Sequence, residues 1–474
     1  MTPDPRDLRI AELERLLSAA LARNVELEAE VRELKARLDQ NSRNSSRPPS
    51  SDGPQVVRVV QKRPTGRKPG GQPGHERSER ELLPVEAVDA VVVLKPERCD
   101  QCNSSRLRPS KAAPARHQQT EIPAFKSLHT EYQCGSSICL DCGAWVQAEL
   151  PPEAEAVFGP RLTATAGALM GQFHLSKRAT QAALRDLTGV KISLGMLPKI
   201  GAEIAAALAQ PAAEAEAYLR EQDVVHADES GWFEGKANGR NRRAWLWLFA
   251  APLVAAFRIA FSRGSDVPKD VLGEDFTGFL STDRWAGYNW YDLGLRQLCW
   301  SHLTRDFQGF IDRGGIGGGL GTRLMRERNR MFRWWHRVGD GRLSRDRFRQ
   351  RMKSVRRRVR RLLEEAVETA EGKTAGMARE MLVLEEAFWT FVDTDNVEPT
   401  NNFAERCVRP GVMYRKTSFG TQSSTGSRFV ERAMTAVTTL NLQKRNVLDF
   451  LTQALRAHRT GVPVPSLLPQ ERGA

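Results

Sequence analysis

Five short segments rich in β-branched and aromatic residues constrain the fold more than any other feature of this sequence. Three follow one another closely, at residues 223–228, 243–249 and 253–261, with short turn-like connections that suit hairpins. The other two, at 278–282 and 296–300, are each reached through a short segment of helical character. Three antiparallel strands followed by two strands reached through helices predict one mixed α/β sheet.

Three acidic residues stand in distinctive places relative to these strands. Asp228 ends the first segment and Asp283 follows the fourth, so both side chains are expected at strand ends. Glu405 lies one helical turn beyond Asn401 and Asn402, which make a plausible helix start. A lone carboxylate of this kind is usually a solvated surface group. Three in this order favour one site for two Mg²⁺ or Mn²⁺ ions that serve phosphoryl transfer, and they match a ribonuclease-H-like catalytic core.

Composition points to a basic protein without membrane segments. Lysine and arginine number 71 against 57 aspartates and glutamates, a net charge of +14, which favours a polyanionic partner. No run of 18 apolar residues is present, so we expect no transmembrane helix. The N-terminus lacks a secretion signal and the seven cysteines fit a reducing compartment. We therefore expect a cytoplasmic protein.

The N-terminal segment has the pattern of a short coiled coil. Apolar residues recur at three- and four-residue spacing from Ile10 to Leu38, and Asn24 falls at a central a position. A buried asparagine there fixes register and favours a dimer, so a homodimer or higher oligomer is expected. The alternative is an amphipathic helix packed on its own chain.

A linker rich in Ser, Asn and Pro follows, and its composition predicts disorder. Arg67 and Lys68 lie in it among glycines and prolines, and they are candidate DNA contacts. A plain solvated tether is the alternative.

Two CxxC pairs predict a zinc site. Cys99 and Cys102 form the first pair, and Cys139 and Cys142 form the second. Two such pairs complete a tetrahedral four-sulfur site, and four protein ligands leave no open position for chemistry. We expect one structural Zn²⁺, although incidental thiols are the alternative.

An Ala- and Leu-rich segment from Phe158 to Leu219 has helical periodicity. Within it, two helical stretches flank a short glycine-containing turn, which is the helix-turn-helix pattern. The second stretch is only weakly basic, so a purely structural helix pair is an equal alternative.

A large helical insertion interrupts the sheet region between Trp300 and Glu405. Its glycine cluster, Gly314 to Gly321, is interpreted as a flexible entry. Residues 323–361 hold 17 arginines and lysines against three acidic residues, and Trp334 and Trp335 lie among them. This imbalance favours DNA contact over a solvated face. The candidate DNA contacts here are Arg356, Arg357, Arg358, Arg360 and Arg361, together with Arg406 and Arg409 beside Glu405.

These features divide the chain into consecutive segments. They are a coiled-coil zipper (1–40), a disordered basic linker (41–80), a zinc-binding domain (81–152), a helix-turn-helix region (153–220), the first half of the core (221–302), a basic helical insertion (303–395), the second half of the core (396–456) and a tail (457–474).

Several motifs together resemble one known family. They are NSRNSSRPPSSDG at 41–53, GRKPGGQPGH at 66–75, the paired CxxC motifs, HADESG, CWSH at 299–302 and NNFAERCVRP, which is the most specific. The chain resembles, nearly end to end, transposases of the insertion sequence 66 type.

The resemblance implies DNA transposition by an Asp-Asp-Glu active site formed by Asp228, Asp283 and Glu405. It implies double-stranded DNA as partner, both element ends and target, with accessory proteins of the same element possible and association with the nucleoid. Two alternatives remain open at this point. One is a ribonuclease-H-like nuclease without strand transfer, and the other is a domesticated DNA-binding regulator.

Overall fold

The structure is a computed structural model that describes residues 5–38, 41, 45–46, 81–110, 112–125 and 127–469. The chain divides into two units, one of Met1–Val56 with Ser127–Ala474 and the other of Val57–Lys126. Most of the predicted linker, including Arg67 and Lys68, lies outside the described residues. Within the described part of the chain, no helix combines the length and apolar character needed to cross a bilayer.

A five-stranded sheet is the main β-structure of the larger unit. Its strands are β3 (Val224–Ala237), β4 (Arg240–Ala251), β5 (Val254–Ala260), β6 (Phe279–Thr282) and β7 (Arg296–Leu298). They lie in the order β5-β4-β3-β6-β7. β3, β4 and β5 pair antiparallel, whereas β3, β6 and β7 pair in parallel. The predicted mixed α/β sheet is confirmed.

The first strand is longer than the sequence pattern predicts. Asn238 and Gly239 join β3 to β4 with φ angles of +52° and +76°, as a type I′ hairpin turn requires. Residues beyond Asp228 find antiparallel partners in β4, so β3 continues to Ala237. The expectation that Asp228 ends its strand is therefore wrong.

Helix α13 (Ser424–Leu442) covers the free edge of β5. Three side chains one helical turn apart accept hydrogen bonds from alternate N–H groups of this edge: Thr439 from Ala255 (3.0 Å), Thr435 from Phe257 (2.9 Å) and Glu431 from Ile259 (2.6 Å). Four residues of a helix advance about 6 Å along its axis, and two residues of a strand advance about 6.8 Å. The spacing of the three side chains on α13 therefore matches the spacing of the N–H groups on β5. The edge is thus closed to pairing with another strand.

Helices before and after the sheet complete the first hydrophobic core. They are α2 (Pro160–Gly171), α3 (Lys177–Thr188), α4 (Met196–Ala207), α5 (Ala209–Arg220) and α14 (Val447–Thr460). Helix α4 packs against α2, α13 and α14 with its apolar face buried, and Trp232, Trp247 and Phe249 are among the largest side chains of this core. The predicted helix pair α3 and α4 is present, with residues 189–195 between its members, whereas a DNA-reading role for it stays a prediction.

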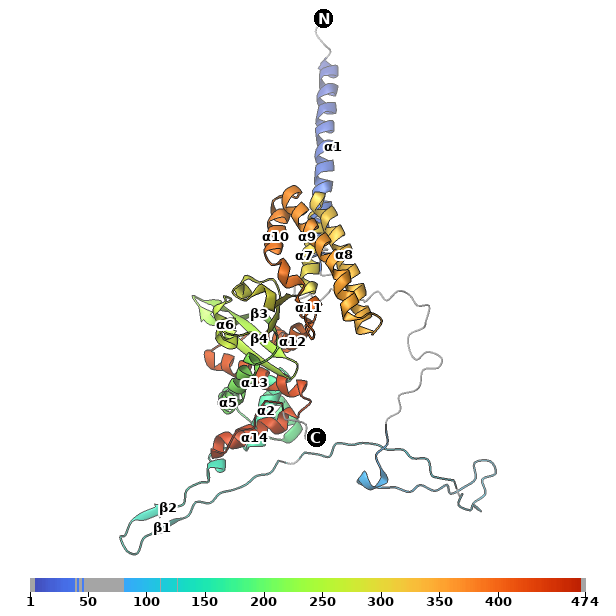
Figure 1. Ribbon diagram of the computed structural model, residues 1–474. Coiled ribbons are helices and arrows are strands. Elements are labelled where there is room, and N and C mark those ends of the chain that lie inside the picture. Colours follow the sequence, from blue (N-terminus) through green and yellow to red (C-terminus); the bar gives the residue numbers. More distant parts are fainter. Residues whose placement is uncertain are drawn as a thin grey trace. The chain divides into compact units, whose positions relative to one another are not determined.

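The insertion is a separate helical lobe with its own core. It consists of α7 (Trp300–Arg313), α8 (Gly315–Gly339), α9 (Arg345–Thr369), α10 (Gly372–Val383), η6 (Glu385–Phe388) and α11 (Thr390–Asp393). Helix α8 packs against α7 and α9, and α10 packs against α9 (Figure 1). Trp335 packs on Phe348 and Phe391 in this second core. Its half-buried ring is therefore a packing element of this core.

The glycine cluster is helical, so its interpretation as a flexible entry is wrong. Residues 315–321 form the first turns of α8. A Cβ atom on Gly321 would lie 2.8 Å from the carbonyl oxygen of Phe307, and one on Gly317 would lie 3.0 Å from a methyl group of Thr374. The glycines therefore allow α8 to approach its neighbours closely.

The N-terminal helix α1 (Pro5–Leu38) confirms the predicted helical segment. Its side chains at Leu17, Leu27 and Leu34 are 60%, 41% and 49% exposed within the single chain, and Asn24 is exposed as well. The remaining elements are η2 (Val85–Ala87), β1 (Ser136–Ile138), β2 (Trp145–Gln147), η3 (Pro152–Ala154), α6 (Asp266–Leu272), η4 (Ala286–Tyr288), η5 (Leu293–Leu295) and α12 (Asn402–Ser418).

Candidate functional site

Asp228 and Asp283 lie on neighbouring parallel strands. The last residues paired between β3 and β6 are His226 and Ser281. Each aspartate lies two residues beyond its member of that pair, so the register sets the two side by side. Asp283 directly follows β6, and its Oδ1 accepts a hydrogen bond from the Trp285 N–H at 2.8 Å.

Glu405 joins them from the first turn of α12, for which Asn401 is the cap residue, as predicted. Burial raises the pKa of Asp228 well above its usual range. The charges of Glu229, Asp283 and Glu405 raise that pKa further. Because a Coulombic effect weakens with distance, these influences indicate that Asp283 and Glu405 lie within electrostatic reach of Asp228.

One buried side chain links the elements that carry Asp228 and Glu405. Asn401 donates from Nδ2 to the carbonyl oxygen of Ala227 at 2.7 Å, and its Oδ1 lies 3.0 Å from His226 Nδ1. Its backbone carbonyl accepts from the Glu405 N–H at 3.2 Å. Asn401 thus begins α12 with its backbone while its side chain, which makes no capping bond, holds β3. The sequence pattern identified Asn401 only as a helix start.

Arg296 is a residue that the sequence reasoning missed. Its side chain is fully buried in β7. Its Nη2 donates to the carbonyl oxygens of Asp283 (3.0 Å) and Trp285 (3.4 Å), its Nε to Thr282 Oγ1 (3.0 Å) and its Nη1 to Asn289 Oδ1 (2.9 Å). Burial lowers the pKa of Arg296 to about 10, so it stays cationic at neutral pH. A charged residue just before the apolar run Leu298 to Trp300 was the signal in the sequence.

Glu229 was also missed, although it directly follows Asp228. Its side chain is 1% exposed and accepts hydrogen bonds from Arg263 Nη2 at 2.7 Å and from the Tyr288 hydroxyl at 2.9 Å. Burial and the charge of Asp283 raise the pKa of Glu229 to about 7, although hydrogen bonds from Arg263 and Tyr288 oppose the shift. This carboxylate is therefore committed to internal partners beside the site.

His302 lies in the first turn of α7, with its Nδ1 3.8 Å from Glu405 Oε1. Burial and the charge of Arg305 together lower the pKa of His302 to about 4. The imidazole is neutral at neutral pH, so this contact is not an ion pair. Cys299 completes a group with His302 and Glu405 whose possible ligand atoms all lie within 4.8 Å of one another.

The predicted DNA contacts fall into two kinds. Arg406 and Arg409 are exposed, one turn apart on the same helix as Glu405. On α9, three arginines form ion pairs within the lobe: Arg356 with Asp393 (2.6 Å), Arg358 with Glu327 (2.8 Å) and Arg360 with Glu364 (3.0 Å). The remaining two, Arg357 and Arg361, are exposed.

The two CxxC pairs have the same local geometry, one in each unit of the chain. Each begins with a cysteine whose N–H and carbonyl both bond across the turn: Cys99 with Ser104 and Asn103 (2.9 and 2.8 Å), and Cys139 with Ala144 and Gly143 (both 2.8 Å). Asn103 and Gly143 share a positive φ, +56° and +73°. Backbone N–H groups lower the pKa of Cys99 and of Cys139, which favours the thiolate that binds metal.

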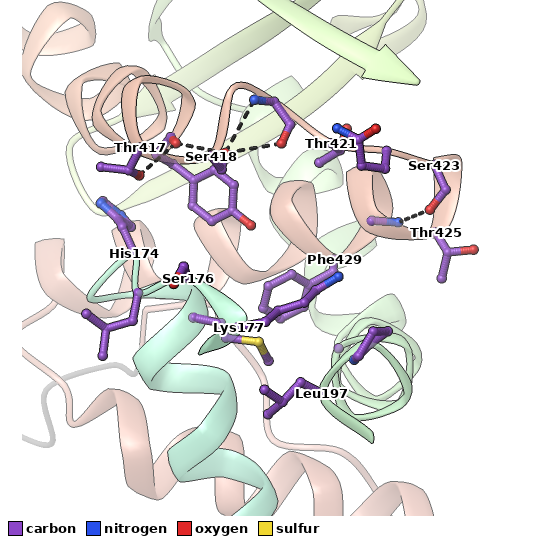
Figure 2. A pocket seen from close by; sticks show the side chains of 18 of the residues that line it. His174, Ser176, Lys177, Leu197, Thr417, Ser418, Thr421, Ser423, Thr425 and Phe429 are labelled. Atoms are coloured by element: carbon purple, nitrogen blue, oxygen red, sulfur yellow. Dashed lines mark hydrogen bonds between the residues drawn. The ribbon is translucent and has the colours of Figure 1, made fainter. Parts of the chain in front are cut away.

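A cavity of about 480 Å³ lies away from the acidic residues, between the helices α2 to α4 and the connection from α12 to α13 (Figure 2). His174, Lys177, Tyr414, Thr421 and Phe429 contribute to its lining. None of the three predicted acidic residues lines it. It is a feature distinct from the candidate site.

One family match covers all five strands of the sheet, the insertion and α12. Residues 155–428 match the family described as Transposase IS66 family. Residues 1–81 match a family of unknown function (DUF6444). The first match includes all three acidic residues, whereas the second covers α1 and the segment that follows it.

One relative is an uncharacterized protein, y4qI, of Sinorhizobium fredii (strain NBRC 101917 / NGR234). It is 26% identical to this chain over 279 residues, which are 53% of this chain and 51% of the relative. The chain thus spans about half the length of the relative that it matches.

Proposed function

Because the chain belongs to the IS66 family of transposases, we propose that it binds the ends of a DNA element, cleaves a strand at each end and joins the freed 3′-hydroxyl to target DNA. The observation that supports this activity is the gathering of Asp228, Asp283 and Glu405. Burial, with the charges of Asp283 and Glu405, raises the pKa of Asp228. Among the described residues, no lysine or arginine forms an ion pair with any of the three.

Like charges held together without a cationic partner fit divalent cations. Hard oxygen ligands suit Mg²⁺ or Mn²⁺, and Asp228, Asp283 and Glu405 would hold two such ions in a ribonuclease-H-like Asp-Asp-Glu site. Such ions, when bound, activate water or a 3′-hydroxyl and stabilise charge on the phosphate. Asn401 and Arg296 keep the carboxylates in place, and no covalent protein nucleophile is needed.

Exposed arginines near the carboxylates suit the DNA backbone. Arg406 and Arg409 share α12 with Glu405, so phosphates bound to them would lie beside the reacting strand. Further phosphate contacts would come from Arg357 and Arg361 on α9 and from Arg67 and Lys68 in the linker. The slope of log affinity for end DNA against log salt measures these contributions, because each lost phosphate contact makes the slope shallower.

A homodimer through α1 would allow two element ends to be held at once. A parallel partner would cover the exposed leucines of the helix and place Asn24 opposite Asn24 of the second chain. Accessory proteins of the same element are further possible partners. Sedimentation of the full chain and of a variant lacking residues 1–39 tests the dimer: a variant that stays dimeric contradicts it.

A structural Zn²⁺ at Cys99, Cys102, Cys139 and Cys142 would fit the matched turns of the two pairs. Two thiolates from each would complete a closed site. Elemental analysis of protein purified under reducing conditions should give about one zinc per chain at this site, and a Cys102→Ser variant should lose it. Equal zinc in both proteins would remove the assignment.

The deciding experiment for the activity uses labelled end DNA with Mg²⁺. Asp228→Asn, Asp283→Asn and Glu405→Gln should each lower cleavage and joining by about 10³-fold, because each removes a metal ligand worth several kcal/mol, while binding of DNA persists. Glu398→Gln, an exposed glutamate near the start of α12, is the control. Wild-type rates in the Glu405→Gln protein would contradict the site. Cleavage without joining of pre-cleaved ends would identify a nuclease, and binding without cleavage a regulator.

A further inference from the structure

The group formed by Cys299, His302 and Glu405 offers a different set of donor atoms from the three acidic residues. Cys299 is the cap residue of α7 and His302 lies in its first turn, while Glu405 lies in the first turn of α12. Their sulfur, nitrogen and oxygen atoms all lie within 4.8 Å of one another. We propose that these three residues bind a borderline divalent cation, for which Zn²⁺ is the best fit, and that this ion competes with the catalytic use of Glu405.

An unsatisfied nitrogen supports the site independently of the cluster itself. His302 Nδ1 is buried and has no hydrogen-bond partner. Its distance of 3.8 Å from Glu405 Oε1 is too long for a hydrogen bond. A buried polar atom without a partner is costly and needs an explanation. A cation between Nδ1 and Oε1 would satisfy both atoms.

The donor chemistry selects the ion. Imidazole and thiolate favour Zn²⁺ or Co²⁺, whereas Mg²⁺ requires oxygen ligands. Modest side-chain rotation would bring the three atoms to coordination distances of ~2.0–2.3 Å. Cys299 would release its thiol proton to solvent on binding. Three protein ligands leave a fourth position for water.

The surrounding structure holds these donors in place. The Asn401 N–H donates to Cys299 Sγ at 3.1 Å. The same residue begins α12 through its bond to the Glu405 N–H. Cys299 itself donates its N–H to Thr282 at 2.9 Å, which ties the start of α7 to strand β6. The site is therefore built on ordered elements of the core.

Sharing Glu405 gives the site a regulatory consequence. A carboxylate committed to Zn²⁺ beside His302 cannot serve the Mg²⁺ site at the same time. Low Zn²⁺ should therefore inhibit Mg²⁺-dependent DNA cleavage. This consequence rests on the proposed function, whereas the binding of the cation does not.

Binding is tested by Co²⁺ titration of the full-length protein, with the CxxC cysteines intact. Wild type should bind one more Co²⁺ per chain than Cys299→Ser or His302→Gln. The sulfur-to-cobalt absorption of that ion should be absent in Cys299→Ser. Cys407→Ser and His336→Ala change a buried cysteine and an exposed histidine elsewhere, and should match wild type. Equal Co²⁺ stoichiometry and spectra in all five proteins, with circular dichroism showing that each is folded, would overturn the site.

Inhibition is tested by titrating Zn²⁺ into the Mg²⁺-dependent cleavage reaction, with each protein normalised to its own rate. The concentration for half inhibition should rise at least about tenfold in Cys299→Ser and His302→Gln, as expected when a metal ligand is lost. Unchanged inhibition in both variants would overturn the competition. A wild type that cleaves nothing in Mg²⁺ would instead contradict the proposed function, and the Co²⁺ result would still decide the site.

Discussion

The sheet and the helical insertion differ in whether their charged side chains are paired. In the insertion, Arg356 and Arg358 meet Asp393 and Glu327 in ion pairs of 2.6 and 2.8 Å. In the sheet, burial and the charges of neighbouring carboxylates raise the pKa of Asp228. The nearby cation Arg296 donates to carbonyl oxygens and forms no ion pair with Asp228, Asp283 or Glu405.

This difference distinguishes charged residues with a structural role from those that form a candidate site. Charges that are already paired within the protein need no further partner, and the exposed pairs among them contribute little to stability. Gathered carboxylates destabilise the fold unless a ligand offsets their repulsion, and such arrangements are typical of functional sites. A large net positive charge in the insertion is therefore a weaker pointer to function than a small, uncompensated negative cluster in the core.

The largest effect is expected from Arg296→Met. The change leaves the carbonyl oxygens of Asp283 and Trp285 without their charged donor, so the free energy of unfolding should fall by about 3 kcal/mol and Mg²⁺-dependent cleavage should fall with it. Arg345→Met is the matched control in the insertion, because Arg345 also donates to two carbonyl oxygens, those of Phe391 and Thr394. It should destabilise the lobe and spare the affinity for Mg²⁺. Equal Mg²⁺ affinity in both variants, measured by titration of cleavage, would remove the positioning role of Arg296.

Asn401→Asp should have the next largest effect. The variant keeps the shape of the side chain but loses the Nδ2 donor to Ala227 and adds a charge near Glu405. Cleavage should fall by about 10²-fold, for a loss of about 1–3 kcal/mol when a buried acceptor loses its partner. Asn402→Asp is the neighbouring control, because Asn402 is exposed and should tolerate the change. Similar rates for the two variants would show that Asn401 only starts the helix.

The pH dependence of stability should differ between the two regions. An acid whose pKa is raised in the folded state keeps its proton there after the unfolded chain has lost its own. Stability without added Mg²⁺ should therefore fall as the pH rises from the usual glutamate range to about 7, the raised pKa of Glu229. Glu229→Gln should flatten this fall, whereas Glu364→Gln in the insertion should leave it unchanged. Denaturant unfolding across this pH range measures the effect, and an equally steep fall in the Glu229→Gln protein would contradict it.

The sequence pattern predicted the sheet because its strands differ sharply from their surroundings in residue type and connection. Asp228 and Asp283 could be selected as candidate site residues for the same reason, because each stands beside such a strand. Glu405 could be selected because it follows a helix-start pattern. Patterns fail where a residue's partner lies far along the chain. They also fail where polar residues continue a strand: Asp228 was expected at a strand end, yet the strand continues to Ala237 in a hairpin with β4.

The supporting residues of the site show the same limit. Asn401 and Ala227 are 174 positions apart, so a helix-start pattern says nothing of the strand that the asparagine holds. Arg296 stood out only as a charged residue beside the apolar run Leu298 to Trp300. In the insertion, a count of charges could not show that Arg358 faces Glu327, since that pair depends on how α8 packs against α9.

The smallest effect separates paired from exposed arginines within α9. Arg357→Ala with Arg361→Ala should reduce the slope of log affinity against log salt by about 1 per lost phosphate contact, with little change in stability. Arg356→Ala with Arg358→Ala should instead lower the free energy of unfolding by roughly 1–3 kcal/mol, because Glu327 loses a partner in a buried setting. Binding to end DNA over a salt series and denaturant unfolding measure the two effects. If the paired set lowers the salt slope as much as the exposed set, the ion pairs open on DNA and the insertion binds it with the whole face of α9. If neither set changes the slope, α9 has only a structural role and the DNA contacts are made by residues beside Glu405.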